Sequence, residues 1–237
     1  MRPLILKTGS AIPELIGRRG DFEHYFAKAL GLSERQYDVL DARFALRLPQ
    51  PAGVDAVIVT GSASAVHDHE PWSVQTGVFL KAVIAAGRPV LGVCYGHQLI
   101  ADALGGRTGR NPNGREIGLV LVSVLEVDPL LEGLPPVFPA FATHQDAVLE
   151  APPLARVLAG NRNSPVQAMA LGPRTRTVQF HPEFDADIMR SYLDARASVV
   201  DAELGPGAAR RLREQVVDVD TGRIILSNFV RFCVTST

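Results

Sequence analysis

The chain has 237 residues with 24 basic and 25 acidic side chains, which gives a formal net charge of −1. This balance provides no global electrostatic reason to expect a nucleic acid or an anionic membrane as partner, so we expect a small-molecule ligand. The length allows one ample core, and we expect a single domain over residues 1–237, with a core over about 1–185 and a helical extension over about 186–237.

The first hundred residues alternate between short apolar runs and helical patterns. These patterns predict strands at residues 4–6, 37–40, 56–59 and 89–93 and helices at residues 21–30 and 74–86. A loop through Pro13 should follow the first strand. The second helix is expected to turn these apolar residues inward: Val78, Phe79, Ala82, Val83 and Ala86. Such alternation is typical of an α/β fold, so we expect a doubly wound, mostly parallel sheet flanked by helices.

A strand passes into a helix with almost no loop at Cys94. The strand over 89–93 precedes this cysteine, and from Gln98 apolar residues recur at helical spacing. Gly92 and Gly96 flank it, as in the G-x-S-x-G elbow of hydrolases. A thiol at the first turn of a helix faces unpaired backbone N–H groups and the positive end of the helix dipole, which favour the thiolate. Cys94 is therefore a candidate nucleophile, since a small cysteine that only packs would not explain the two glycines.

The second half of the chain predicts further strands and then helices. Residues 119–127 alternate in polarity, which indicates antiparallel strands at the edge of the sheet after a loop over 108–115. Residues 167–170 and 177–180 predict the two strands of a hairpin. From residue 186 onward the pattern is helical, and this extension is expected either to cover the core or to contact a partner protein.

The second strand of that hairpin leads to His181 and Glu183. Pro182 ends the strand, so both side chains should be presented at one edge of the sheet. Cys94, His181 and Glu183 would then form a Cys-His-Glu triad, in which His181 accepts the thiol proton and later donates it to a leaving amine. Considered alone, His181 could be a structural histidine whose hydrogen bonds are satisfied in a loop. Its pairing with Cys94 argues against this alternative.

Two segments of the chain resemble the signatures of the class I glutamine amidotransferase family, in the version found in GMP synthase and its stand-alone relatives. They are Gly-Val-Cys-Tyr-Gly-His-Gln at 92–98 and Phe-His-Pro-Glu at 180–183, and the resemblance extends over roughly residues 55–183. It implies a flavodoxin-like fold with a small antiparallel edge. It also implies that the cysteine attacks the side-chain amide of glutamine, forms a γ-glutamyl thioester and releases ammonia.

The resemblance also implies roles for residues around the triad. The backbone N–H groups of Gly61 and Tyr95 are expected to form the oxyanion hole, although Gly61 could also be a simple turn glycine. Gln98 is expected to bind the amino-acid end of the substrate. His144 and Asp146 match the family's His-x-Asp segment, and they should either line the glutamine pocket or hold its loop.

The polar segment His-Asp-His-Glu at residues 67–70 could suggest a metal site. Its spacing is wrong for a closed zinc site and no cysteine is near, so we expect a lid or the start of a helix there. The chain also lacks a glycine-rich phosphate loop of the Walker type. We therefore expect neither a metal nor a cofactor.

The cysteines and the lengths of the apolar runs indicate in which cellular compartment the protein is located. An active thiolate at Cys94 is incompatible with a structural disulfide to Cys233, the chain's other cysteine. The apolar run in residues 1–7 is too short for a secretory signal, and no segment reaches the length of a membrane span. We expect a cytoplasmic location.

Together these observations favour a glutamine amidotransferase-type hydrolase whose substrate is glutamine or another γ-glutamyl small molecule. A separate synthetase subunit would be the partner that accepts the ammonia, since the sequence has no sign of an acceptor domain. Two alternatives stay open. One is a γ-glutamyl peptide hydrolase acting on glutathione-like compounds, and the other is a non-catalytic regulatory or binding module with the same fold.

Overall fold

The computed structural model describes residues 2–235, with side chains for residues 2–232. The strands are β1 (Leu4–Lys7), β2 (Asp38–Asp41), β3 (Val57–Val59), β4 (Val90–Val93), β5 (Arg107–Arg110), β6 (Glu116–Val124), β7 (Val137–His144), β8 (Asp146–Glu150), β9 (Ala155–Gly160), β10 (Ala168–Leu171) and β11 (Thr175–Val178). The helices are α1 (Pro13–Arg19), α2 (Phe22–Leu30), α3 (Pro71–Ala85), α4 (Tyr95–Ala103), α5 (Ala186–Ala195), α6 (Ala197–Leu204), α7 (Ala208–Glu214) and α8 (Thr221–Thr235).

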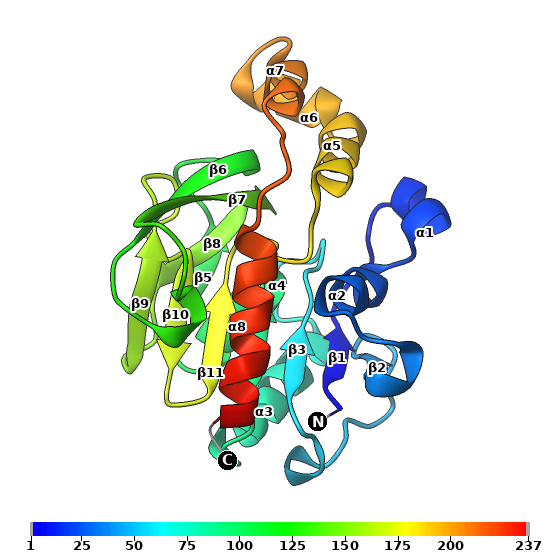
Figure 1. Ribbon diagram of the computed structural model, residues 1–237, viewed down its shortest axis with the longest axis vertical. Coiled ribbons are helices and arrows are strands. Elements are labelled where there is room, and N and C mark those ends of the chain that lie inside the picture. Colours follow the sequence, from blue (N-terminus) through cyan, green and yellow to red (C-terminus); the bar gives the residue numbers. More distant parts are fainter. Residues whose placement is uncertain (1, 236–237) are drawn as a thin grey trace.

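Within the described residues, the strands form a nine-stranded sheet and a separate β5-β8 pair (Figure 1). The order in the large sheet is β2-β1-β3-β4-β11-β10-β9-β6-β7. The first five strands run parallel, and the last four continue the sheet with antiparallel pairing. The predicted α/β fold with a parallel centre and an antiparallel edge is confirmed, and the antiparallel edge comprises four strands.

Helices cover both faces of the parallel strands. Along β3, Val57 and Val59 point to the core under α3 and α4, while Ile58 points to the core under α2 and α8. The strands β1, β3 and β4 are buried on both faces, which is why their sequences are nearly continuous apolar runs. The carboxyl ends of β3, β4 and β11 therefore meet at one rim of a sheet that is closed on both sides.

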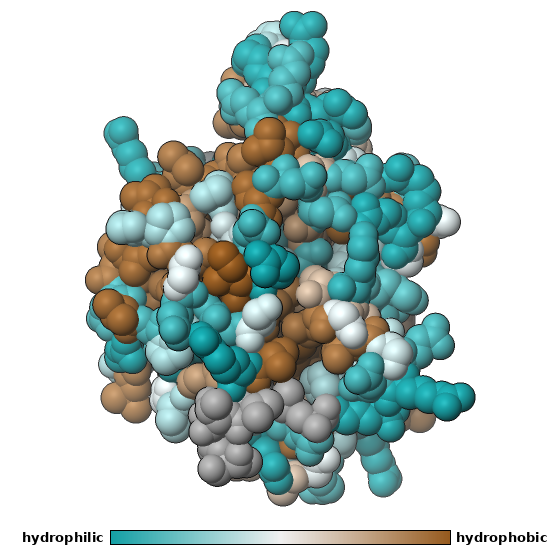
Figure 2. Space-filling model, viewed as in Figure 1, coloured by the Kyte–Doolittle hydropathy of each residue, from teal (hydrophilic) through white to brown (hydrophobic). Residues whose placement is uncertain are grey.

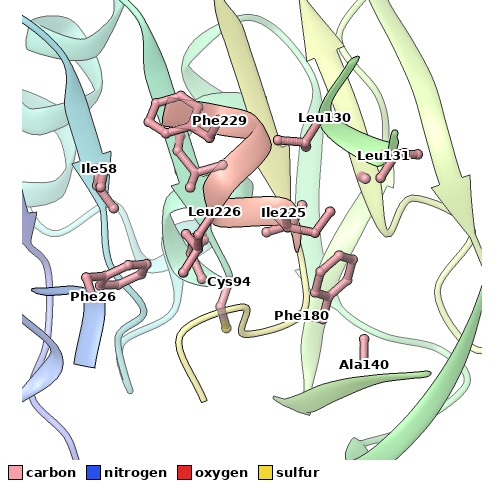
Figure 3. Close-up of a cluster of buried hydrophobic side chains, with 14 of the residues drawn as sticks. Phe26, Ile58, Cys94, Leu130, Leu131, Ala140, Phe180, Ile225, Leu226 and Phe229 are labelled. Atoms are coloured by element: carbon pink, nitrogen blue, oxygen red, sulfur yellow. The ribbon is translucent and has the colours of Figure 1, made fainter. Parts of the chain in front are cut away.

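Helix α8 is part of the main core. Its residues Ile225, Leu226 and Phe229 are buried against Phe26 of α2 and the adjacent sheet face (Figure 3). Of the two expectations for the C-terminal extension, covering the core is the one that α8 fulfils. The division at about residue 185 stays a prediction, because the last helix of the extension contributes directly to the core of the preceding residues.

The other three helices of the extension form a separate group that projects beyond the sheet (Figure 1). Apolar residues of α5 and α6 pack with α1, α2 and the start of β6. Ile188, Met189, Tyr192 and Leu193 of α5 are buried, as the helical pattern predicts. Mostly hydrophilic side chains cover the projecting part (Figure 2), so α5–α7 are anchored at their base and solvated at their tip.

Two predicted loops are wrong. The loop through Pro13 contains α1, which begins at this proline because a missing N–H costs nothing in the first helical turn. Part of the loop over 108–115 is strand β5, which pairs with β8 far along the chain.

The predicted inward face of α3 is also partly wrong. Phe79 and Val83 are buried as predicted, but Val78, Ala82 and Ala86 are exposed. The helix buries Gly77 and Leu80 in addition. Since apolar residues occur nearly all round this helix, their spacing did not define one buried face. No helix in residues 2–235 is long and apolar enough to span a bilayer.

Candidate active site

The turn between β4 and α4 holds Cys94 in a strained conformation. Its φ of 52° and ψ of −101° are rare for a residue with a side chain. A Cβ at Gly96 would lie 2.7 Å from the Val59 carbonyl oxygen, and one at Gly92 would lie 2.7 Å from the Gly96 oxygen. Both flanking positions therefore require glycine. The turn places a buried thiol at the N-terminus of α4, where N–H groups lack partners inside the helix.

The structure brings Cys94, His181 and Glu183 together. Glu183 Oε1 lies 2.8 Å from His181 Nδ1, and Cys94 lines the same cavity as this imidazole and acts on its pKa. All three side chains are buried. Burial acts to lower the pKa of His181, but the Glu183 carboxylate and Cys94 outweigh it and raise this pKa to about 10. This raised pKa favours a charged imidazole beside the Glu183 carboxylate and Cys94.

Aromatic rings and a backbone hydrogen bond hold His181 in place. Phe184 stacks on the imidazole with ring centroids 4.2 Å apart, and Phe22 lies parallel at 6.3 Å. The His181 N–H donates to the Phe141 carbonyl of β7 at 2.8 Å. Cys94 is a free thiol, and the side chain of Cys233 lies outside the described residues.

Gly61 and Tyr95, the residues expected to form the oxyanion hole, both lie next to Cys94. A Cβ at Gly61 would lie 3.0 Å from His181 Cε1 and 3.7 Å from Cys94 Cβ, so this backbone touches both side chains. Tyr95 is the first residue of α4. Thr8 Oγ1 donates to the Gly61 carbonyl at 3.2 Å and to the Thr60 carbonyl at 2.9 Å, which fixes the turn after β3. The backbone at Gly61 is thus held beside Cys94 by the turn after β3, and Tyr95 follows Cys94 at the start of α4.

A cavity of about 250 Å³ opens beside Cys94 and contains the other predicted binding residues. Gln98 donates through Nε2 to the Asp146 carbonyl at 2.8 Å and to Gln179 Oε1 at 3.1 Å. His144 has Nδ1 2.9 Å from that same carbonyl and Nε2 3.0 Å from Glu116 Oε2. Gln98 and His144 therefore hold the cavity loop with these nitrogens, whereas the Asp146 carboxylate remains beside the cavity.

Glu116 is a residue that the sequence reasoning missed. It is buried at the start of β6 and accepts hydrogen bonds from His144, Asn161 and Gln167. Such a buried carboxylate with several partners braces the wall of the cavity. The sequence feature that could have pointed to Glu116 is its position in the segment Arg115-Glu-Ile-Gly118.

A second cavity, of about 220 Å³, lies on the His181 side of the thiol. Its walls include apolar residues from the segment before α1 and from α2 and α5, among them Ile12, Phe22 and Tyr192. Cys94 and Arg196 line both cavities. The thiol thus lies where a polar cavity and a more apolar one meet.

The polar segment at 67–70 does not converge on one point. His67 Nδ1 lies 3.8 Å from Asp146 Oδ2, whereas Glu70 accepts a hydrogen bond from Trp72 at the start of α3. The Trp72 ring stacks on Tyr95 with centroids 5.6 Å apart. Among the described residues, no three side chains of the metal-ligating types gather at one place.

The fold and the site define an α/β protein with a candidate cysteine nucleophile at the end of a central parallel strand. The family model for class-I glutamine amidotransferases matches residues 21–195, so the chain belongs to that family. The resemblance that the two sequence motifs indicated is therefore confirmed.

Individual relatives agree with this family. A glutamine-hydrolyzing GMP synthase of Aeropyrum pernix is 42% identical over 156 residues, which cover 65% of this chain and 29% of that protein. One subunit of the glutamine-hydrolyzing GMP synthase of Sulfurisphaera tokodaii is 36% identical over 146 residues, covering 55% of this chain and 77% of that one. The chain spans 29% to 35% of the length of the first full-length GMP synthases it matches.

Solved structures show the same fold. A glutamine amidotransferase of Thermotoga maritima superimposes with a TM-score of 0.78 at 19% identity, over 98% of both chains. A structure from Thermoplasma acidophilum, described as one of the subunits of a GMP synthase, superimposes with a TM-score of 0.68 at 18% identity, over 100% of this chain and 96% of that one. The agreement extends over the C-terminal helices as well as the sheet.

Proposed function

We propose that the protein hydrolyses the side-chain amide of glutamine through a thioester on Cys94. The observation that carries this proposal is the His181 imidazole, which lies between the Cys94 sulfur and the Glu183 carboxylate. A protonated imidazole beside a thiol favours the thiolate, which is the nucleophilic form. Glu183 orients the ring and stabilises its charge.

The proposed reaction has two acyl-transfer steps. The Cys94 thiolate attacks the amide carbon, and the backbone N–H groups of Gly61 and Tyr95 stabilise the oxyanion that forms. His181 gives its proton to the nitrogen, the C–N bond breaks, and ammonia leaves a γ-glutamyl thioester. His181 then takes a proton from water, whose oxygen attacks the thioester and releases glutamate.

The amino-acid end of glutamine is proposed to lie in the cavity with Gln98 and Asp146. The Asp146 carboxylate is the acidic group of this cavity, and it complements the α-ammonium of the substrate. His144 would act indirectly, because both of its ring nitrogens contact other protein groups.

The direct test compares wild-type protein with Cys94→Ala and Cys233→Ala. Purified wild-type protein and Cys233→Ala should release ammonia and glutamate from glutamine, and Cys94→Ala should not. A glutamine analogue with an electrophilic side chain should label the wild-type protein and Cys233→Ala, but not Cys94→Ala. A wild-type protein that is neither active nor labelled would support a non-catalytic module with this fold.

A separate synthetase subunit is the proposed acceptor of the ammonia. Relatives of similar length are named as one of the subunits of GMP synthase, which implies a further subunit in those proteins. We expect such a subunit to raise the glutaminase rate of this chain when the two are mixed. A reactive thiol further suggests that the protein works in the reducing cytoplasm.

Hydrolysis of γ-glutamyl peptides is the second candidate, and the cavity on the His181 side favours it. Because His181 protonates the leaving group, that group should lie on this side of the thiol. The cavity of about 220 Å³ is far larger than ammonia needs. Comparable rates on glutamine and on γ-glutamyl dipeptides would support this activity, and hydrolysis of glutamine alone would exclude it.

A further inference from the structure

Arg196 is a cation of the active site that has no carboxylate partner among the described side chains. It lies at the junction of α5 and α6 and lines both cavities beside Cys94. Within the described side chains, no carboxylate lies within ion-pair distance of its guanidinium. Burial lowers the pKa of Arg196, with Tyr192 and Cys94 partly opposing this effect and Arg115 adding to it. A partly buried charge left in this way costs free energy unless a ligand compensates it.

The second arginine of the same cavity is different. Arg115 Nε lies 2.7 Å from Glu203 Oε2, and its Nη2 donates to Gln145 Oε1 at 2.9 Å. Its charge is thus balanced inside the protein. The contrast leaves Arg196 as the cationic group of the cavity whose charge a substrate can balance.

Two contacts hold the Arg196 guanidinium in position before any ligand arrives. Nη1 donates to Thr143 Oγ1, and the guanidinium lies over the Tyr192 ring, 5.1 Å from its centroid. A guanidinium has five N–H donors in a planar fork, and one hydrogen bond uses only part of them. The remaining donors suit the two oxygens of a carboxylate.

We propose that Arg196 binds the α-carboxylate of the γ-glutamyl substrate. This inference rests on the proposed function, in which the amide carbon is bonded to Cys94 and the α-carbon lies in the cavity with Asp146. The Arg196 charge interacts with Cys94, as expected for a group within reach of a substrate bound there. Asp146 and Arg196 then provide opposite charges in one cavity, which matches the zwitterionic end of an amino acid.

The test measures binding, so that it does not depend on turnover. L-glutamine and its α-carboxamide, which has no carboxylate, are titrated calorimetrically into Cys94→Ala protein. Loss of a charged hydrogen-bonded pair corresponds to about a 10- to 100-fold preference for L-glutamine. The preference should nearly vanish in Cys94→Ala/Arg196→Gln and return in part in Cys94→Ala/Arg196→Lys. The preference is the ratio of the affinities of one protein for L-glutamine and for its α-carboxamide. A general loosening of the cavity would weaken both affinities equally and leave this ratio unchanged.

The matched control is Cys94→Ala/Arg213→Gln. Arg213 pairs with Asp194 at 2.7 Å on the surface of the same helical group, so its loss changes the net charge equally and should leave the preference intact. An unchanged preference in the Arg196→Gln protein, or no preference in Cys94→Ala, would overturn the inference.

A role of Arg196 at the leaving group is the competing outcome. If Arg196→Gln weakens binding of γ-glutamylglycine but leaves the preference for L-glutamine intact, the arginine contacts a carboxylate of the leaving group and the inference fails. Failure of the proposed function is a separate result: wild-type protein would then show the binding preference without releasing glutamate.

Discussion

Two buried histidines near Cys94 have opposite electrostatic environments. His97 of α4 has Nδ1 2.8 Å from Thr177 Oγ1 and Nε2 3.2 Å from the Val166 carbonyl, and its burial lowers the pKa to about 3. Burial also acts to lower the pKa of His181, but Glu183 and Cys94 raise it to about 10. Burial without an acidic neighbour thus favours a neutral imidazole, whereas the adjacent Glu183 and Cys94 favour a charged one.

The difference separates a structural histidine from a candidate catalytic one. His97 is satisfied by neutral partners and ties α4 to β11. The raised pKa of His181 favours its charged form beside Cys94, which is the state that the proposed cysteine nucleophile would require. The difference in pKa between His97 and His181 depends on a few neighbouring groups, so substitutions of those groups should remove it.

The largest expected effect comes from Glu183→Gln. Without the carboxylate, burial should dominate and His181 should lose its charge, so that its region comes to resemble that of His97. We expect the rate of glutamate release to fall about 10²- to 10⁴-fold, together with slower alkylation of Cys94 by iodoacetamide. Both can be measured on purified protein.

Asp128→Asn is the matched control for Glu183→Gln. Asp128 is a buried carboxylate that pairs with Arg176 at 2.8 Å, so its loss should destabilise the fold without a comparable loss of rate. Equal rates of glutamate release for wild type and Glu183→Gln would show that the Glu183 carboxylate is not what distinguishes His181 from His97.

Gly96→Ala should disturb both regions, because this glycine lies between Cys94 and His97 on the same turn. The added Cβ would lie 2.7 Å from the Val59 oxygen and 2.8 Å from Val59 Cβ, so α4 must shift. We expect a loss of about 1–3 kcal/mol in the free energy of unfolding, measured with denaturant, and a loss of activity.

Gly17→Ala is the control for Gly96→Ala, since a Cβ at this helical position meets nothing within 4 Å. It should change stability by about 1 kcal/mol or less, in the favourable direction. Equal stability of the two variants would mean that α4 adapts without strain.

The region of His181 could be predicted from the sequence because its geometry is encoded locally. A strand, a glycine, a cysteine and another glycine define the turn at Cys94 within five residues. His181, Pro182 and Glu183 likewise lie together in the chain. The parallel sheet follows from the same apolar runs, since strands buried on both faces lack polar alternation.

The surroundings of the triad could not be predicted in the same way. Arg196 and Glu116 acquire their significance from contacts with distant segments, and an arginine in a helical pattern is typically a surface residue. Strand β5 was missed because its partner β8 is about forty residues away. The sequence pattern predicts Val78 on the buried face of α3, although it is exposed, because an apolar helix has no distinct face until its neighbours are known.

His97→Gln should affect stability more than rate, the reverse of His181→Gln. It leaves the Thr177 hydroxyl and the Val166 carbonyl with imperfect partners, which should cost about 1–3 kcal/mol in the free energy of unfolding. Glutamate release should change little in the folded protein. A severe loss of rate at unchanged stability would show that His97 takes part in the chemistry.

The pH dependence of stability should have opposite signs for the two histidines. The pKa of His181 lies above the value of about 6.5 in an unfolded chain, so its contribution is complete below that pH and is lost as the pH rises toward about 10. His97 has a lowered pKa, so its contribution is present above about pH 6.5 and is lost on acidification. The slope for one group is at most about 1.4 kcal/mol per pH unit.

The test compares the unfolding free energies of wild type, His97→Gln and His181→Gln across this pH range. The value for His97→Gln should converge with that of wild type in acid, and the value for His181→Gln should converge with it in base. Convergence at the same end would mean that both imidazoles are in the same protonation state, and the distinction between the two regions would then rest on geometry alone.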